Sequence, residues 1–291
     1  MQDLDQAIRL DGKNATAWYN RGIAWHEQHD DERAIADFSQ AIKLDPNLAA
    51  AYGARGKALS SQGEFDKAVA DLTQAVKLDG KDAAAYNDRG IAFSLKGDTD
   101  KAIADYNQAV ATDAKYAPTY NNRGIAFRAR GDSDRALQDY GQALALDGHY
   151  EAAFYNRGNA KYDKGDYAGA IADLDSALKL RPADVQALNN RANAYANRRD
   201  LDRAVADLTQ ALRLKPDFAQ AHNDRGVAYA ARGDIERAGA DFDQAVKIDP
   251  KNAIAWYNRG LARRERRDLD RAIQSFGEAV TTPRSVRAPC R

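Results

Sequence analysis

Small and apolar residues recur along this chain at the three- and four-residue spacing of one helical face. The first such face carries Ala17, Trp18, Gly22 and Trp25, and a second apolar stripe with the same spacing runs through 66–78. A Gly-Asp pair usually separates consecutive stretches, because glycine can end one helix in the left-handed conformation and aspartate can cap the next. The pattern predicts pairs of short helices that are too short to be stable alone and must stack on their neighbours.

The pattern repeats every 34 residues. Arginine recurs with this step at Arg21, Arg55, Arg89, Arg123, Arg157, Arg191, Arg225 and Arg259. Residues 1–14 match the second half of a repeat, and 287–291 remain as a tail. The eight predicted repeats are 15–48, 49–82, 83–116, 117–150, 151–184, 185–218, 219–252 and 253–286. We therefore expect one array of repeats and no second domain.

Positions are numbered from the first residue of each repeat, so that Trp18 is at position 4 of repeat 15–48. Most repeats combine an aromatic residue at position 4, glycine at position 8, a bulky residue at position 11 and small or aromatic residues in the second helix. The first repeat shows this set as Trp18, Gly22, Trp25, Ala34, Phe38, Ala41 and Pro46. The pattern closely resembles the tetratricopeptide repeat family over essentially the whole chain. The resemblance implies an all-α fold, a right-handed superhelical solenoid of eight helix-turn-helix repeats. Leu188 and His222 replace the aromatic residue at position 4, which predicts weaker packing there.

Charge and hydropathy exclude several classes of protein. Lys and Arg total 43 and Asp and Glu total 43, so the formal net charge is zero and no nucleic-acid partner is expected. No run of 18 apolar residues occurs, so we expect no membrane insertion. The N-terminus has no basic region followed by an apolar run, which favours a cytoplasmic location if the chain is complete. The single cysteine, Cys290, leaves the compartment unknown.

The sequence offers no constellation of catalytic or metal-binding residues. His26 and His29 are three residues apart, whereas the helix of a zinc protease needs its two histidines four apart. The recurring glycines fall inside predicted helices and not in a phosphate-binding loop. We therefore expect no enzyme activity, no cofactor and no metal.

The repeated arginine occupies position 7, on the face predicted to be packed. An aspartate follows sixteen residues later at Asp37, Asp71, Asp105, Asp139, Asp173, Asp207 and Asp241. We predict a desolvated, bidentate ion pair between the two helices of each repeat. The alternative is that both side chains turn to solvent, as most charged residues do. The eighth repeat has Ser275 instead, so Arg259 lacks that partner.

The resemblance also implies a concave groove lined by the first helices, with side chains from positions 2, 5, 6, 9, 12 and 13. The candidate peptide-binding residues are Asn20, Asn122, Asn156, Asn190 and Asn258 at position 6, with Tyr19, Tyr155 and Tyr257 at position 5. An asparagine side chain can pair with a peptide backbone as donor and acceptor, and tyrosine adds flat amphipathic area. The alternative is a solvated polar surface.

We expect a non-catalytic scaffold that binds an extended peptide or a partner segment in this groove. The alternative is a structural or assembly module that acts through its open ends and convex face, with the groove unused. Neither end of the array has an obvious polar capping helix. We therefore expect either that the chain is a fragment of a longer protein or that its uncapped ends associate with another copy or a partner.

Overall fold

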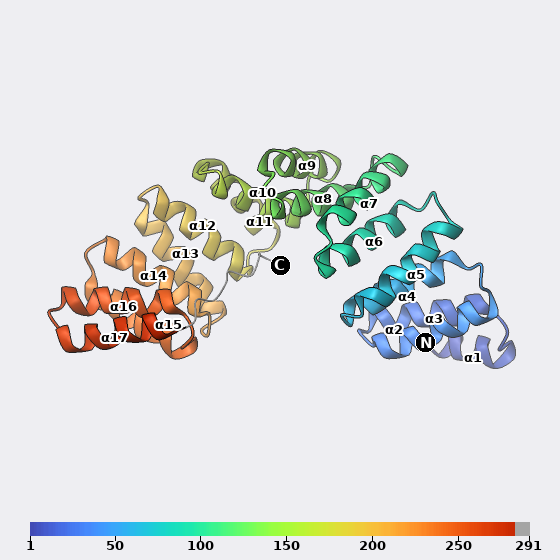
Figure 1. Ribbon diagram of the computed structural model, residues 1–291, viewed down its shortest axis with the longest axis horizontal. Helices are drawn as coiled ribbons and strands as arrows, with labels where there is room; N and C mark the ends of the chain where they lie inside the picture. The colour runs from blue at the N-terminus through green and yellow to red at the C-terminus, as the bar shows by residue number, and fades with distance from the viewer. Residues whose placement is uncertain (283–291) are drawn as a thin grey trace. The chain divides into compact units, whose positions relative to one another are not determined.

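The computed structural model describes residues 1–282, which form seventeen α-helices and no strand (Figure 1). The helices are α1 (Gln2–Leu10), α2 (Ala15–Glu27), α3 (Asp31–Leu44), α4 (Ala49–Ser61), α5 (Phe65–Leu78), α6 (Ala83–Lys96), α7 (Thr99–Thr112), α8 (Ala117–Ala129), α9 (Ser133–Leu146), α10 (Glu151–Asp163), α11 (Tyr167–Leu180), α12 (Val185–Asn197), α13 (Leu201–Leu214), α14 (Ala219–Ala231), α15 (Ile235–Ile248), α16 (Ala253–Glu265) and α17 (Leu269–Thr281). Positions 283–286 of the eighth predicted repeat, the tail 287–291 and Cys290 lie outside the described residues. The predicted all-α solenoid of helical repeats is confirmed.

The helix ends follow from local hydrogen bonding. At the start of α2, Asn14 Oδ1 accepts a hydrogen bond from the Ala17 amide at 3.1 Å. Glycine provides the left-handed residue at the end of α6, where Gly97 has φ 92°. Within residues 1–282, the residues other than glycine with positive φ are His29 (61°), Arg199 (64°) and Arg267 (62°). These three turns carry the steric cost of a Cβ in the left-handed region, about 1–2 kcal/mol each.

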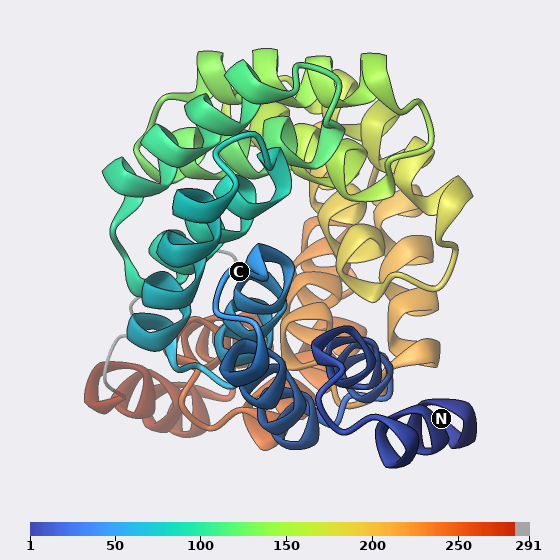
Figure 2. The same ribbon diagram turned by 90° about the vertical axis from the view of Figure 1, so that its right-hand side faces the viewer.

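The chain divides into two compact units, and the first, Met1–Gly148, contains α1 to α9. Each hairpin in it packs on the next in chain order, α3 on α4, α5 on α6 and α7 on α8 (Figure 2). Glycine at position 8 allows the two helices of a hairpin to approach closely. A Cβ on Gly22 would lie 2.5 Å from Phe38 Cε1, and one on Gly90 would lie 2.6 Å from Tyr106 Cε1. Both rings are buried, so any larger residue would displace them.

The second unit, His149–Arg291, is described as far as residue 282 and contains α10 to α17. Its hairpins also stack in chain order, α11 on α12, α13 on α14 and α15 on α16. Ala192 takes the place of the position 8 glycine in one repeat and is fully buried in a cluster with Leu208. Leucine there replaces the aromatic ring found opposite glycine in several repeats, but leucine alone does not explain the alanine, because a Cβ on Gly56 would lie 2.6 Å from Leu72 Cγ.

The predicted arginine–aspartate pairs are confirmed in all seven repeats that contain the aspartate. In the third repeat, Arg89 Nε and Nη2 each donate to an oxygen of Asp105 at 2.7 Å. Asp105 is 7% exposed, so the alternative that both side chains turn to solvent is wrong. The hydrogen bond with Asp105 raises the pKa of Arg89, which remains charged.

Six of these arginines also contact the preceding second helix, a contact that the 34-residue period does not predict. The third donor nitrogen, Nη1, reaches a side chain sixteen residues earlier in the chain. These acceptors are Asp5, Ser39, Thr73, Asn107, Asp175 and Thr209. Each such arginine therefore joins the two helices of its own repeat to the repeat before it.

Candidate functional site

The predicted site residues lie on the first helices of their repeats and differ in exposure. Asn20 on α2 is exposed, and Tyr257 on α16 is 51% exposed. The other predicted site residues are half-buried: Asn122, Asn156, Asn190, Asn258, Tyr19 and Tyr155. Asn20, Tyr19 and Asn122 belong to the first compact unit and the remaining five to the second, so each group is described within its own unit.

Asn122 and Asn258, at position 6, are hydrogen bonded to the preceding first helix. Asn122 Nδ2 donates to Asn87 Oδ1 at 3.0 Å, and Asn258 Nδ2 donates to Asn223 Oδ1 at 2.9 Å. Both bonds run from position 6 of one repeat to position 5 of the repeat before it. Each asparagine amide has two hydrogens and two acceptor sites, so one such bond uses only part of its capacity.

Asn190 makes a different pair of contacts within the second unit. Its Nδ2 donates to the Tyr155 hydroxyl at 3.1 Å and to Asn159 Oδ1 at 2.9 Å. The structure therefore brings two predicted site residues, Asn190 and Tyr155, into direct contact. Tyr19 and Tyr257 instead lie against aromatic rings of second helices, with centroid distances of 6.0 Å to Phe38 and 5.7 Å to Phe276.

Position 5 does not face an open groove where it is occupied by asparagine, and that part of the expectation is wrong. The four side chains concerned are 2–4% exposed: Asn87, Asn121, Asn189 and Asn223. They lie between neighbouring first helices, where a short amide can bond to the next repeat but has little access to a ligand. In the sequence, these bonds between neighbouring first helices correspond to pairs of asparagines 35 residues apart, Asn87 with Asn122 and Asn223 with Asn258.

Asp224 occupies position 6 in the seventh repeat and is held by four amide groups. Its Oδ1 accepts hydrogen bonds from Gln220 Nε2 at 2.6 Å and Asn223 Nδ2 at 3.1 Å. Its Oδ2 accepts from Asn189 Nδ2 at 3.1 Å and Asn193 Nδ2 at 3.0 Å. An aspartate cannot donate as asparagine does at this position, and Asn189 Oδ1 is left buried without a hydrogen-bond partner among residues 1–282.

Asp88 is the acidic residue at position 6 of the third repeat, in the first unit. Its side chain is 15% exposed, with Lys57 Nζ at 3.7 Å and Asn87 Nδ2 at 3.3 Å. Burial raises the pKa of Asp88 above its ordinary value, although Lys57 and Asn87 act in the opposite direction. We call the surface formed by the position 5 and position 6 side chains the first-helix face. At position 6 it carries asparagine amides in five repeats and the carboxylates of Asp88 and Asp224 in two others.

Two further properties of the described residues concern metal binding and membrane crossing. Among residues 1–282, no group of three or more His, Cys, Asp or Glu side chains is arranged to hold a metal ion. No helix in the same residues is long and apolar enough to cross a bilayer.

Comparisons with known proteins identify the repeats. Family models described as tetratricopeptide repeat match residues 15–48, 54–117, 189–253 and 242–274, and a TPR repeat model matches 125–165 and 158–198. A comparison with curated proteins found no match.

Several solved structures have the same fold. YrrB, a TPR protein with an unusual peptide-binding site, is 24% identical with a TM-score of 0.56, over 63% of this chain and 95% of its own. A tetratricopeptide repeat protein from Parabacteroides merdae is 20% identical with a TM-score of 0.62, over 85% of this chain and 98% of its own. The Cut9–Hcn1 assembly of APC/C is 18% identical with a TM-score of 0.66, over 98% of this chain and 57% of that chain. This chain belongs to the tetratricopeptide repeat family.

Proposed function

We propose that this chain binds an extended segment of a partner protein along the first helices of its repeats. Tetratricopeptide repeat folds are generally scaffolds for protein–protein interactions and are typically non-catalytic. The observation that carries the proposal is the partly used hydrogen-bonding capacity of Asn122 and Asn258. Asn122 gives one amide hydrogen to Asn87 and accepts one bond from Asn121 Nδ2 at 3.4 Å. A second amide hydrogen and a second acceptor site remain for a peptide backbone.

The bonds within the chain support this use of the asparagines. Because Asn87 holds the Asn122 amide, the Asn122 side chain loses less conformational freedom when a ligand binds. The same argument applies to Asn258, which is held by Asn223. Asn20 is exposed and differs from these two, so its contribution is expected to be smaller. YrrB, which shares the fold, is a peptide-binding protein.

The charge of the first-helix face favours a neutral or mildly basic segment. Positions 2, 5 and 6 contain no lysine or arginine in any of the eight repeats. Asp88 and Asp224 add two carboxylates at position 6. A segment with lysine or arginine beside its backbone contacts would gain from their charge.

The test starts from a displayed library of unstructured peptides, from which binders are selected against the chain. The affinity of a selected peptide is then measured for the chain and for the Asn156→Ala, Asn190→Ala, Asn258→Ala variant, whose three substitutions all lie in the second unit. Loss of three hydrogen bonds of about 0.5–1.5 kcal/mol each is expected to weaken binding at least ten-fold. Asn47→Ala, in an exposed loop, is the matched control. Unchanged affinity in the triple variant would refute the groove as the binding surface.

A second candidate function, assembly through an end of the array, is favoured by the apolar face of α17. Ile273 is 70% exposed and Val280 85%, whereas the residues at the same positions in other repeats, Ile103 and Val246, are each 6% exposed. In those repeats the next first helix covers the equivalent face, as Val246 packs with Ala255. A hollow of about 610 Å³ beside Val280 is lined partly by Ile254, Tyr257 and Phe276.

Self-association is the form of assembly that we propose for this face. The test is the mass of the chain measured by light scattering over a range of concentrations. Ile273→Lys and Val280→Lys are expected to abolish any rise in mass with concentration, because a charge on this face would have to be desolvated. Leu95→Lys is the control, since Leu95 is also exposed, at 52%, but lies on α6. A mass that stays at one chain at every concentration would exclude this candidate.

A further inference from the structure

The last repeat contains two largely buried arginines where the other repeats bury an arginine–aspartate pair. Arg259 takes the usual position 7, but Ser275, fully buried, stands where the aspartate would be. Arg263 takes position 11, which is aromatic in most repeats. The side chains of Arg259 and Arg263 are each only 16% exposed.

The contacts of Arg259 differ from those of its seven counterparts. In the other repeats Nε donates to the buried aspartate, whereas Arg259 Nε lies 2.7 Å from Asp243 Oδ1 on the preceding helix. This contact is an ion pair without hydrogen-bond geometry, and the buried Nε has no hydrogen-bond partner among the described residues. The guanidinium carbon lies 4.7 Å from the centre of the Trp256 ring.

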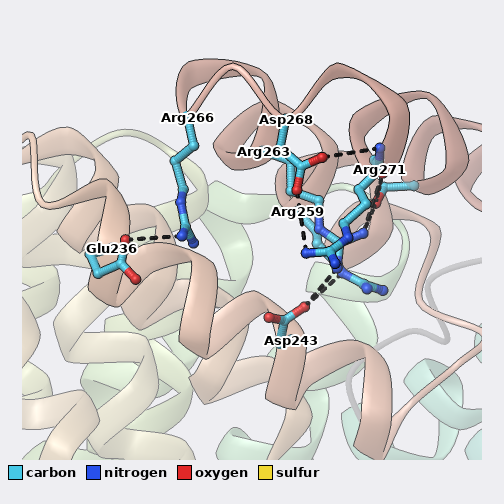
Figure 3. Close-up of polar contacts among 8 residues, drawn as sticks. Glu236, Asp243, Arg259, Arg263, Arg266, Asp268 and Arg271 are labelled. Atoms are coloured by element: carbon cyan, nitrogen blue, oxygen red, sulfur yellow. Dashed lines mark hydrogen bonds and ion pairs between the residues drawn. The ribbon is translucent and has the colours of Figure 1, made fainter.

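Arg263 fills part of the space next to Ser275. Its Nη1 donates to Ser275 Oγ at 3.1 Å and to the Arg271 carbonyl at 3.3 Å. Its Nη2 lies 3.4 Å from Asp243 Oδ1, the same oxygen that Arg259 contacts (Figure 3). Two guanidinium groups therefore share one oxygen of a carboxylate whose side chain is 54% exposed.

Neighbouring acids balance the local charge only in part. Burial lowers the pKa of Arg263 and the charge of Arg259 lowers it further, whereas the charges of Asp243 and Asp268 act in the opposite direction. The nearby surface acids are engaged elsewhere, since Asp268 lies 3.5 Å from Arg271 and Glu236 lies 3.4 Å from Arg266 (Figure 3).

The fifth repeat shows how two cations are accommodated elsewhere in the chain. Arg157 and Lys161 occupy the same two positions, 7 and 11, as Arg259 and Arg263. Both contact the buried carboxylate of Asp173, at 2.6 Å and 2.8 Å. Two cations at these positions are thus matched by a buried acid in one repeat and by a serine in the other.

We propose that Arg259 and Arg263 form a binding site for a carboxylate supplied by a ligand, at the edge where both guanidinium groups contact Asp243. The site is distinct from the first-helix face, because positions 7 and 11 lie between the helices of the hairpin. A guanidinium group binds a planar carboxylate through two parallel hydrogen bonds, as the seven internal pairs do. The carboxylate comes either from a free small acid or from an Asp or Glu side chain of a partner.

The experiment measures hydrogen exchange of the α16–α17 amides with succinate, with N-acetyl-aspartate amide as a side-chain mimic, and with sodium chloride at the same ionic strength. Amides that exchange when this hairpin opens are expected to exchange about ten-fold more slowly when succinate or the aspartate mimic is present at about ten times its dissociation constant. The α10–α11 amides serve as the internal reference. Binding of succinate alone identifies a free acid as the ligand, and binding of the aspartate mimic identifies a partner side chain.

Two substitutions test the site itself. Ser275→Asp restores the internal partner of Arg259, so it is expected to protect α16–α17 without any ligand and to abolish the response to succinate. Arg263→Phe restores the aromatic residue found at Phe93 and Phe127, and is expected to reduce the response at least five-fold. Arg264→Gln, at a side chain 57% exposed on the same helix, is the control and keeps the response. The proposal fails if chloride protects as well as the carboxylates, or if Arg263→Phe responds as the unchanged chain does.

Discussion

Asn122 and Asn87, 35 residues apart in the chain, are joined side chain to side chain by a hydrogen bond of 3.0 Å between α8 and α6. Asn258 and Asn223 repeat this relationship in the second unit at 2.9 Å. The asparagine column therefore has a structural role in holding neighbouring first helices together. Any ligand contact by these residues is made by amides that the fold has already oriented.

We predict an energetic coupling between Asn87 and Asn122. Each residue is changed to alanine singly and then together, and the unfolding free energy of each variant is measured. Since a net hydrogen bond is worth about 1 kcal/mol and Asn87 is only 2% exposed, the double variant should lose less stability than the two single losses added together, by about that amount. Asn87→Ala combined with the distant Asn47→Ala should be additive. Additivity in the Asn87/Asn122 pair would contradict the role assigned to their hydrogen bond.

The buried arginine–aspartate pairs should be far more sensitive to substitution than the ion pairs on the surface. Asp105→Asn leaves Arg89 largely buried beside a neutral amide, and we expect it to cost about 3–5 kcal/mol of local stability. The matched change is Asp66→Asn, which removes the exposed partner of Lys96 and should cost far less, because solvent screens this pair. Hydrogen exchange in α6 and α7 gives both values. Equal effects of the two substitutions would show that the Asp105 pair is not desolvated.

The three left-handed residues other than glycine mark sites where the chain can be stabilised. His29→Gly, Arg199→Gly and Arg267→Gly should each raise the unfolding free energy by up to about 1 kcal/mol, because glycine adopts this conformation without the Cβ penalty. Gly97→Ala is the converse change, at φ 92°, and should lower stability. The comparison uses urea unfolding of each variant. A loss of stability in all three glycine variants would mean that their side chains make stabilising contacts that outweigh backbone strain.

The fold could be predicted from the sequence because the period and the small residues are explicit. Glycine at position 8 and the alanines of the second helix specify close helix packing, and arginine and aspartate sixteen residues apart specify the pair. The contacts between repeats could not be read in the same way. The bonds from Asn122 to Asn87 and from Arg89 Nη1 to Thr73 depend on how far adjacent hairpins are rotated and separated, which the period alone does not determine.

His222 also makes a contact that the sequence pattern does not predict. Because it replaces the usual aromatic residue at position 4, the pattern predicts weaker packing there. In the structure its Nε2 lies 3.0 Å from the Pro216 carbonyl oxygen, equivalent to the bond from Trp18 Nε1 to the Gly12 carbonyl at 3.0 Å. Trp18 and His222 thus share a ring nitrogen that contacts the backbone carbonyl six residues earlier, in addition to the size of the ring.

The raised pKa of Asp88 predicts how stability depends on pH in the first unit. Because burial raises the pKa in the folded chain above its unfolded value, the ionised carboxylate destabilises the fold at neutral pH. Asp88→Asn should therefore be more stable than the unchanged chain at pH 7. The difference should shrink as the pH falls through the folded pKa and should vanish below the unfolded pKa of about 3.9, where Asp88 is neutral in both states.

The measurement is urea unfolding at a series of pH values, followed by the fluorescence of the tryptophan side chains or by hydrogen exchange in α6. Asp241→Asn provides the opposite case, because hydrogen bonds from Arg225 and His222 outweigh burial and lower the pKa of Asp241. The ionised Asp241 carboxylate therefore stabilises the fold above the unfolded pKa, and this stabilisation is lost as the pH falls through the folded pKa. Asp241→Asn should be less stable than the unchanged chain at pH 7. If Asp88→Asn is less stable than the unchanged chain at pH 7, burial is not the dominant influence on Asp88, and the carboxylate is stabilised by Lys57 instead.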